Sequence, residues 1–234
     1  MPQDRSVPFA ETLEAMDKLH KAGKFKELGL SNFTSFEVAE VVLTCKYNGW
    51  VRPTIYQGVY NCIQRGIEPE LIPACHRYGL DVAVYSPIAG GLFSGAFVDK
   101  NSVPTEGRFS DKFMNGRLRD RYFKDSTFEA LGELKEAADR HGINMIEVAL
   151  RWLVHHSKLN IKDGGNDGVI IGVSKLDHVS SNLDGLEKGP LADDVLAALD
   201  RVWTIVKPEA GNYWHMDLQY TYDTQEALFG NGAK

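Results

Sequence analysis

The stretch that decides the fold lies at residues 23–33 and reads GKFKELGLSNF. Before it, apolar residues recur at helical spacing and predict a helix over residues 9–21. Gly23 then stands where a left-handed C-terminal cap belongs. Residues 25–30 are few and largely apolar, which favours a strand. A helix is therefore expected to lead almost directly into a strand.

A second helix is expected immediately after this strand. Residues 31–34 have turn chemistry, and Thr34 with Glu37 has the pattern of a capping box, in which each side chain bonds the other residue's backbone N–H. This helix is expected to reach about Tyr47. The stretch thus predicts one repeat of an alternating pattern of strands and helices.

The same alternation continues along the rest of the chain. Strands that alternate with amphipathic helices imply parallel pairing with right-handed crossovers, and hence an α/β sheet or barrel. Four strands are expected in all. The further expected strands are residues 54–57, 81–85 and 169–171, and the further expected helices are residues 69–78, two helices with capping boxes from Ser126 to Glu129 and from Asn144 to Glu147, residues 176–186 and residues 192–206.

The composition is that of one ordinary globular domain. The chain has 234 residues, of which 43% are hydrophobic and 25% are charged, and this excludes the disordered and fibrous classes. We expect a single domain over residues 1–234, in which residues 209–234 form a tail without clear periodicity.

Charge and cysteine content limit the classes of partner and the kinds of site expected for this chain. A formal net charge of −6 leaves no basic face of the size that nucleic acid or an anionic membrane would need. Cys45, Cys62 and Cys75 are an odd number without CxxC spacing, which predicts free thiols rather than disulfides or a zinc site. No apolar run approaches the roughly 20 residues of a membrane span. We therefore expect a cytoplasmic protein with a small-molecule partner.

A long connection follows the third expected strand. Residues 86–124 have weak periodicity and include Gly90, Gly91 and Gly95, and the segment is long for a plain connection. This pattern is typical of a functional loop.

Four segments, taken together, resemble the aldo-keto reductases in order and spacing. The resemblance covers nearly the whole chain and is strongest to the aflatoxin-aldehyde reductase and norsolorinic acid reductase branch, which includes fungal members of secondary metabolism. The segments are residues 23–33, Tyr56-Gln57, residues 85–92 (YSPIAGGL) and Gly172-Val173-Ser174.

This resemblance implies the family's (β/α)₈ TIM barrel, with the four strands here matching its strands 5–8. The chain is therefore expected to be an N-terminally truncated member, the C-terminal half of the barrel with C-terminal helices and a tail. The family's catalytic Asp, Tyr, Lys and His come from the first four strands, so no catalytic residue is assigned. Without the Tyr as proton donor and the His that orients the carbonyl, we expect the chain to be inactive alone. The resemblance also implies NADPH as cofactor and an aldehyde or ketone as substrate.

The first cofactor-binding residues implied by the resemblance end two strands. In the family, residues matching Ser31 and Asn32 hydrogen-bond the nicotinamide carboxamide, and Gln57 matches a second amide contact. Strand ends in a barrel lie on the face where ligands bind. Turn and N-cap chemistry would also select Ser-Asn, and an ordinary strand-end Gln is the alternative for Gln57.

The second group follows the strand that ends at Tyr85. Its ring matches a position on which the nicotinamide stacks in many family members, and a barrel-core tyrosine is the alternative. Glycines in the next residues would let backbone N–H groups approach the pyrophosphate, unless the segment is a plain flexible loop. The family commonly continues with a Lys that reaches the phosphates, whereas this chain has Ala96. The residues of this group after Tyr85 are Ser86, Pro87, Ile88, Ala89, Gly90, Gly91, Leu92 and Gly95.

The third group lies between the last strand and the next helix. Gly172, Ser174 and Lys175 match the family's site for the adenosine 2′-phosphate, at a helix start that favours anions. His178 and Asn182, one turn apart, match contacts to adenine or ribose. Helix capping and surface charge are the alternatives for Ser174 and Lys175.

Other features have ordinary explanations. His155 and His156 are adjacent on a helix and point in different directions, which argues against a metal site. A group of arginines in the long connection could contact phosphate or an acidic substrate, although a solvated loop explains them too. These arginines are Arg108, Arg117, Arg119 and Arg121.

Two hypotheses about function result. The chain is an NADPH-dependent aldo-keto reductase family member, or it is a non-catalytic half-barrel that binds nucleotide or serves as an interaction module. In the second case, open strand edges and an uncovered apolar face would favour a homodimer or association with a complementary half-barrel.

Overall fold

The computed structural model describes residues 4–162 and 164–230, and these fall into two compact units. The first unit lies within Met1–Gly58, Pro69–Val82 and Tyr213–Lys234, and the second comprises Val59–Glu68 and Ala83–Asn212. The single-domain prediction stays a prediction, and each unit is described by itself.

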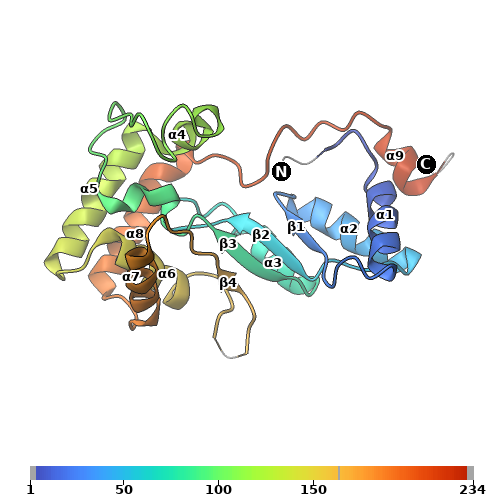
Figure 1. Ribbon diagram of the computed structural model, residues 1–234, viewed down its shortest axis with the longest axis horizontal. Helices are drawn as coiled ribbons and strands as arrows, with labels where there is room; N and C mark the ends of the chain where they lie inside the picture. The colour runs from blue at the N-terminus through green and yellow to red at the C-terminus, as the bar shows by residue number, and fades with distance from the viewer. Residues whose placement is uncertain (1–3, 163, 231–234) are drawn as a thin grey trace. The chain divides into compact units, whose positions relative to one another are not determined.

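Most helices of the first unit come from the N-terminal part of the chain (Figure 1). Its elements are α1 (Phe9–Lys21), β1 (Gly29–Ser31), α2 (Ser35–Asn48), most of β2 (Ile55–Val59), α3 (Leu71–Arg77), the start of β3 (Asp81–Tyr85) and α9 (Thr224–Phe229).

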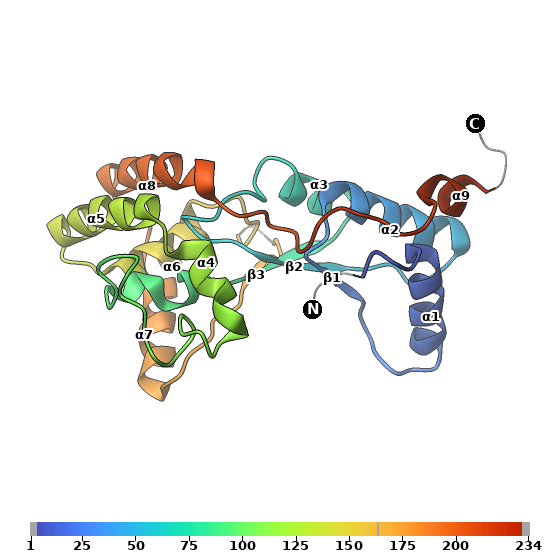
Figure 2. The same ribbon diagram turned by 90° about the horizontal axis from the view of Figure 1, so that it is seen from above.

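The second unit contains the long helices of the middle and end of the chain. Figure 2 shows α5 and α8 side by side along one face of this unit. Its elements are the ends of β2 and β3, η1 (Ala89–Ser94), η2 (Met114–Gly116), α4 (Arg117–Tyr122), α5 (Asp125–Arg140), α6 (Met145–His155), β4 (Gly168–Val169), α7 (Leu176–Glu187), α8 (Asp193–Val206) and η3 (Lys207–Glu209).

The described strands hydrogen-bond in the order β1-β2-β3-β4. β1 pairs with β2 in parallel, with Ser31 in register with Gln57. β3 pairs with β4 in parallel, with Val84 in register with Val169. Parallel strands require crossover connections, and helices supply these here. The residues at which the strands end therefore carry the loops of interest.

Local sequence signals explain the helices of the first unit. The Thr34 side chain accepts from the Glu37 backbone N–H, and the Glu37 carboxylate accepts from Thr34, so the expected capping box is confirmed. Gly23, which follows the C-cap residue Ala22 of α1, has a φ of +70°, the left-handed conformation expected there. Val38 and Val41 of α2 are fully buried or nearly so and belong to the core of this unit.

Glu37 also belongs to a buried polar cluster in this unit, which we call the Glu37 cluster and define as Arg5, Thr34, Glu37 and Tyr220. The Arg5 Nε donates to Glu37 Oε1 at 2.7 Å, and the Tyr220 hydroxyl donates to the same oxygen at 2.6 Å. Arg5 also donates to the carbonyls of His215 and Asp217. The cluster thus bonds residues near both ends of the chain.

Several expected elements differ from the observed ones. The strand expected over residues 25–30 is limited to Gly29–Ser31, since Lys24, Lys26 and Glu27 are exposed and do not fit a buried strand. The capping box expected at Ser126 is wrong. Lys124 is the N-cap of α5, and the Ser126 hydroxyl bonds the Glu209 carboxylate instead.

The expectation of a C-terminal half-barrel is also wrong. The described strands form a four-stranded sheet with helices rather than a truncated half-barrel. Its terminal strands, β1 and β4, have three and two residues, which leaves few unpaired backbone groups at the edges. The half-barrel followed from matching these strands to strands 5–8 of a complete barrel, and not from any signal in their own sequence.

Two further sequence expectations concern cysteines and membranes. Cys45, Cys62 and Cys75 all lie in the described part of the chain, where they are buried and form no disulfide. Among the described residues, no helix is both long enough and apolar enough to cross a membrane.

Candidate functional site

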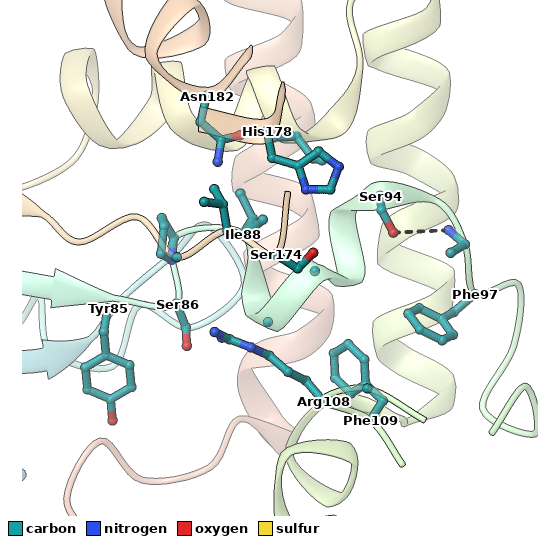
Figure 3. Close-up of a pocket in the computed structure, with 18 of the residues that line it drawn as sticks. Tyr85, Ser86, Ile88, Ser94, Phe97, Arg108, Phe109, Ser174, His178 and Asn182 are labelled. Atoms are coloured by element: carbon teal, nitrogen blue, oxygen red, sulfur yellow. Dashed lines mark hydrogen bonds between the residues drawn. The ribbon is translucent and has the colours of Figure 1, made fainter. Parts of the chain in front are cut away.

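A cavity of about 590 Å³ in the second unit brings together segments that are far apart in the sequence. It is formed by the turn after β3, the loop after η1 and the segment between β4 and α7 (Figure 3). We call it the β3 cavity. It is lined by Tyr85, Ser86, Pro87, Ile88, Gly90, Gly91, Ser94, Ala96, Phe97, Pro104, Glu106, Gly107, Arg108, Phe109, Ile146, Ile170, Gly172, Val173, Ser174, His178, Ser181 and Asn182.

The turn after β3 has an unusual backbone. Ser86 has a φ of +58° and Ala89 a φ of +48°, in the left-handed region that residues other than glycine rarely adopt. Gly90 and Gly91 follow with φ values of +72° and +104°. Strained backbone of this kind persists only where the surroundings impose it, and it concentrates at ligand sites.

A buried asparagine hydrogen-bonds the start of this turn. The Asn61 side-chain amide donates to the Ser86 carbonyl at 2.9 Å and to the Tyr122 hydroxyl at 3.2 Å. Asn61 is fully buried and is held by an isolated bridge to Gln64. The sequence does not point to Asn61, because nothing local in a polar loop distinguishes a residue whose partner is the turn after another strand.

The interior side of this turn is apolar. Ala89, Leu92 and Phe93 are buried in the unit, and of the predicted group Ala89, Leu92 and Gly95 do not line the β3 cavity. These side chains anchor η1, and so hold the backbone of the neighbouring Gly90 and Gly91 against the cavity. Their contribution is to fix the turn.

The segment between β4 and α7 forms the opposite wall. Gly172 and Ser174 line the cavity, and His178 and Asn182 follow from α7 (Figure 3). Asn182 is only 5% exposed, yet it lines this cavity. Lys175 is the N-cap residue of α7 and does not line the cavity. The polar side chains of His178 and Asn182 thus line the same cavity as the strained turn.

An aromatic cluster holds the third wall. Phe109 is 2% exposed, and its ring lies 5.1 Å from that of Phe97 and 5.0 Å from that of Phe123, measured between centroids. Phe97 and Phe109 line the cavity themselves. Arg108, which precedes Phe109, lines it too, whereas Arg119 bonds Asp111 elsewhere in the loop.

The ionisable side chains that line the cavity are Tyr85, Glu106, Arg108 and His178. Burial raises the pKa of Tyr85, and the positive charge of Arg121 acts in the opposite direction. Tyr85 is therefore neutral at ordinary pH and offers a ring face and a hydroxyl. Among the described residues, no group of three or more metal-ligating side chains occurs.

The remaining predicted residues lie in the first unit. Ser31 ends β1 and Gln57 lies beside it in β2, because the two are register partners. Asn32 follows with a φ of +64° and is 3% exposed. The structure thus brings Ser31 and Gln57 together, and places a second strained residue at a strand end.

Known proteins resemble this chain over most of its length. The model of the aldo/keto reductase family matches residues 3–204. Rat aflatoxin B1 aldehyde reductase member 2 is 42% identical over 90% of this chain and 59% of its own length. An aldo-keto reductase of Pseudocercospora fijiensis is 40% identical over 90% of this chain and 71% of its own length. Aldo-keto reductase pigE of Monascus ruber is 35% identical, over 91% of this chain and 63% of its own length.

These matches bear on two of the sequence expectations. The resemblance itself is confirmed, whereas the truncated half-barrel is contradicted by a family match that extends over residues 3–204 as well as by the four-stranded sheet. The chain spans about three fifths of the rat relative's length. On these similarities, the chain belongs to the aldo/keto reductase family.

Proposed function

We propose that this chain binds NADPH in the β3 cavity and takes part in reducing an aldehyde or ketone. The observation that carries the proposal is the meeting of the strained turn after β3 with Gly172, Ser174 and His178 in one cavity. Members of the family generally use a nicotinamide cofactor and act on small carbonyl compounds. The names of the rat and human relatives specify an aldehyde.

The residues that line the cavity fit a dinucleotide. Gly91 has no side chain to keep a phosphate away from the backbone, and a Cβ there would meet nothing within 4 Å. Arg108 and Ser174 add a cation and a hydroxyl donor, and Glu106 is the one carboxylate among the lining residues. Polar donors thus outnumber groups that would repel an anion.

We assign roles along the cavity. Tyr85 offers its ring to the nicotinamide, the turn at Gly90 and Gly91 lets the pyrophosphate approach the backbone, and His178 and Asn182 contact the adenosine. Bound NADPH would supply the hydride. Reduction also needs a proton for the carbonyl oxygen, and none of the residues assigned here donates it.

Selectivity for NADPH over NADH is part of the proposal. Ser174 and Lys175 precede the first turn of α7, where backbone N–H groups and the helix dipole favour a negative charge. We assign the 2′-phosphate to this position. Ser31, Asn32 and Gln57 of the first unit are proposed to bind the carboxamide, and their substitution tests that role separately.

The first experiment is a titration of the purified chain with NADPH and, in parallel, with NADH, followed by protein fluorescence and thermal unfolding. A micromolar dissociation constant and a preference for NADPH of about tenfold or more are expected. Binding that is absent at millimolar concentration would refute the proposal. Ser174→Ala with Lys175→Ala is expected to lower the preference, and Lys162→Ala, outside the cavity, serves as the matched control.

Turnover is tested in a second experiment. NADPH oxidation is followed with an aromatic aldehyde present, and the rate is compared with that of the chain without aldehyde. Saturable turnover would support reduction by the chain itself. Tight binding without turnover would restrict the function to binding the cofactor, which is the outcome that a nucleotide-binding module would give.

A further inference from the structure

The linker between α7 and α8 is hydrogen-bonded to side chains of α6, and all three helices belong to the second unit (Figure 1). The Arg151 guanidinium donates to the carbonyls of Gly189 and Pro190, both at 2.7 Å. One turn further along α6, the His155 ring bonds the Lys188 carbonyl at 2.6 Å. Three successive carbonyls of the linker are therefore held by α6.

His156, the C-cap residue of α6, bonds the same linker in the opposite sense. The backbone N–H of Leu191 donates to His156 Nε2 at 2.9 Å. Because a backbone N–H can only donate, Nε2 carries no proton and accepts the bond. The Leu191 side chain is 5% exposed and belongs to the core of the unit. The bond thus requires a neutral His156 ring, and it fixes the linker at its buried residue.

The neighbouring histidine has the reverse arrangement. Nε2 of His155 faces the Lys188 carbonyl and therefore donates, while Nδ1 lies 2.8 Å from the Lys162 ammonium and therefore accepts. A carbonyl oxygen accepts equally from a neutral and from a charged ring. Of the two histidines, only His156 has a linker bond that a proton on the ring would break.

Charged groups from several segments act on the His156 ring. Burial lowers the pKa of His156 below its ordinary value of 6.5. The nearby groups that lower it further are His155, Lys162 and Arg151. Asp193, at the start of α8, opposes them, and the Lys188 ammonium of the linker is bonded to Glu147. The ring is therefore neutral near pH 7, and a proton added to Nε2 would set two donors against each other.

We propose that His156 is a pH-sensitive latch, which holds the α7–α8 linker to α6 while its ring is neutral and releases the linker when Nε2 is protonated. The inference goes beyond the proposed function and does not depend on it, because it concerns the linker and not a ligand. Release frees the C-terminal end of α7, the helix from which His178 and Asn182 line the β3 cavity.

The direction of the pH effect follows from the lowered pKa. Between the pKa of folded His156 and the ordinary value of 6.5, the folded state binds fewer protons than the unfolded state. The stabilisation by the latch is therefore complete above pH 6.5 and is lost as pH falls through the lowered pKa of the folded state.

The test follows the protection of the Leu191 backbone N–H against hydrogen exchange by NMR, relative to an unstructured peptide at each pH. The pH is lowered from 8 until the Nε2 chemical shift shows that the His156 ring is fully protonated. Protection of Leu191 is expected to fall severalfold, with the same midpoint as the ring. In His156→Gln, whose side-chain oxygen can accept from Leu191 but does not titrate, protection should stay constant. The matched control is His155→Gln, which should keep the fall.

Four results would overturn the inference. They are an Nε2 that carries a proton at pH 8, protection of Leu191 that stays constant while the ring titrates, an equal fall in His156→Gln, and a fall that disappears in His155→Gln. Thermal unfolding shows whether each variant keeps its fold. If His156→Gln does not fold, the midpoints of the ring and of Leu191 protection in the natural chain decide, because separate midpoints contradict the latch.

Discussion

Arg5 and Arg108 carry the same charge in opposite settings. Arg5, in the first unit, is 5% exposed, and it donates to the Glu37 carboxylate and to two backbone carbonyls. Arg108, in the second unit, is exposed to the β3 cavity, and among the described residues it has no carboxylate partner. A charge whose bonds are completed within the fold stabilises that fold. A charge that faces a cavity with its donors open is available to a ligand.

The largest effect on stability is expected where Arg5 is paired with Glu37 within the fold. Glu37→Ala removes the carboxylate that Arg5, Thr34 and Tyr220 all bond, and leaves the Arg5 charge buried without its counterion. Breaking a buried ion pair from one side costs about 3–5 kcal/mol. We expect the free energy of unfolding, measured by urea denaturation, to fall by about this amount.

The control for this prediction is Glu11→Ala, which removes an exposed carboxylate from the same unit and should change stability by less than about 0.5 kcal/mol. An effect of Glu37→Ala as small as that of the control would break the comparison. It would mean that the Glu37 cluster does not stabilise the fold, despite its burial.

The Glu37 cluster also indicates what sequence can and cannot predict. The capping box was predictable, because Thr34 and Glu37 are three residues apart and the pattern is local. Their bonds to Arg5 and Tyr220 were not, because the partners come from distant parts of the chain. Helix α9 was not predicted either. Its six residues bury nothing, and only the Asp223 cap marks its start.

The candidate site divides in the same way. Tyr85, Ser86, Gly90 and Gly172 were found by their resemblance to a family. Arg108 was treated as one of several loop arginines, because its direction depends on how Phe109 packs against rings elsewhere in the loop. Such packing has no signal in the spacing of the residues.

Two glycines of the β3 cavity, Gly90 and Gly172, differ in what an added side chain would meet. Gly90→Ala places a Cβ 2.8 Å from Leu118 Cδ2 at a φ of +72°, so strain and a clash combine. We expect a loss of about 2 kcal/mol in unfolding free energy by urea denaturation. Gly172→Ala meets only the flexible end of Arg108, at 3.3 Å, and should cost less than about 0.5 kcal/mol.

Gly172→Ala, the substitution that costs the fold less, is expected to weaken NADPH binding. Gly172→Ala leaves the fold intact but displaces the Arg108 guanidinium, so the dissociation constant of NADPH should rise severalfold in a fluorescence titration. If Gly172→Ala in the Arg108→Ala background weakens NADPH binding as much as it does alone, its effect does not pass through the guanidinium.

A smaller effect is expected when the stability that Glu37 contributes is followed as a function of pH. Burial pushes the pKa of Glu37 up, but hydrogen bonds from Arg5, Thr34 and Tyr220 outweigh it and hold the pKa below its ordinary value of 4.5. The folded state therefore binds fewer protons than the unfolded state near this pH. The stabilisation is fully present above pH 4.5 and is lost as pH falls through the lowered pKa of the folded state.

The measurement is the unfolding free energy between pH 3 and pH 7 for the natural chain and for Glu37→Gln. The difference between the two should narrow as pH falls below 4.5. A difference that stays constant over this range would show that the Glu37 carboxyl titrates alike in the folded and unfolded states.

The smallest expected effect concerns the one carboxylate that lines the β3 cavity. Glu106 shares the cavity with Arg108 but does not pair with it in the part of the chain that the structure describes, so its charge opposes an anionic ligand. Glu106→Gln should therefore strengthen NADPH binding about two- to threefold, since solvent screens the charge. The gain should shrink at high salt, because screening weakens the repulsion. Glu129→Gln, an exposed position outside the cavity, is the matched control in the same fluorescence titration. Weaker binding by Glu106→Gln would mean that the carboxylate orients Arg108, which would place the two arginines of this comparison in one class.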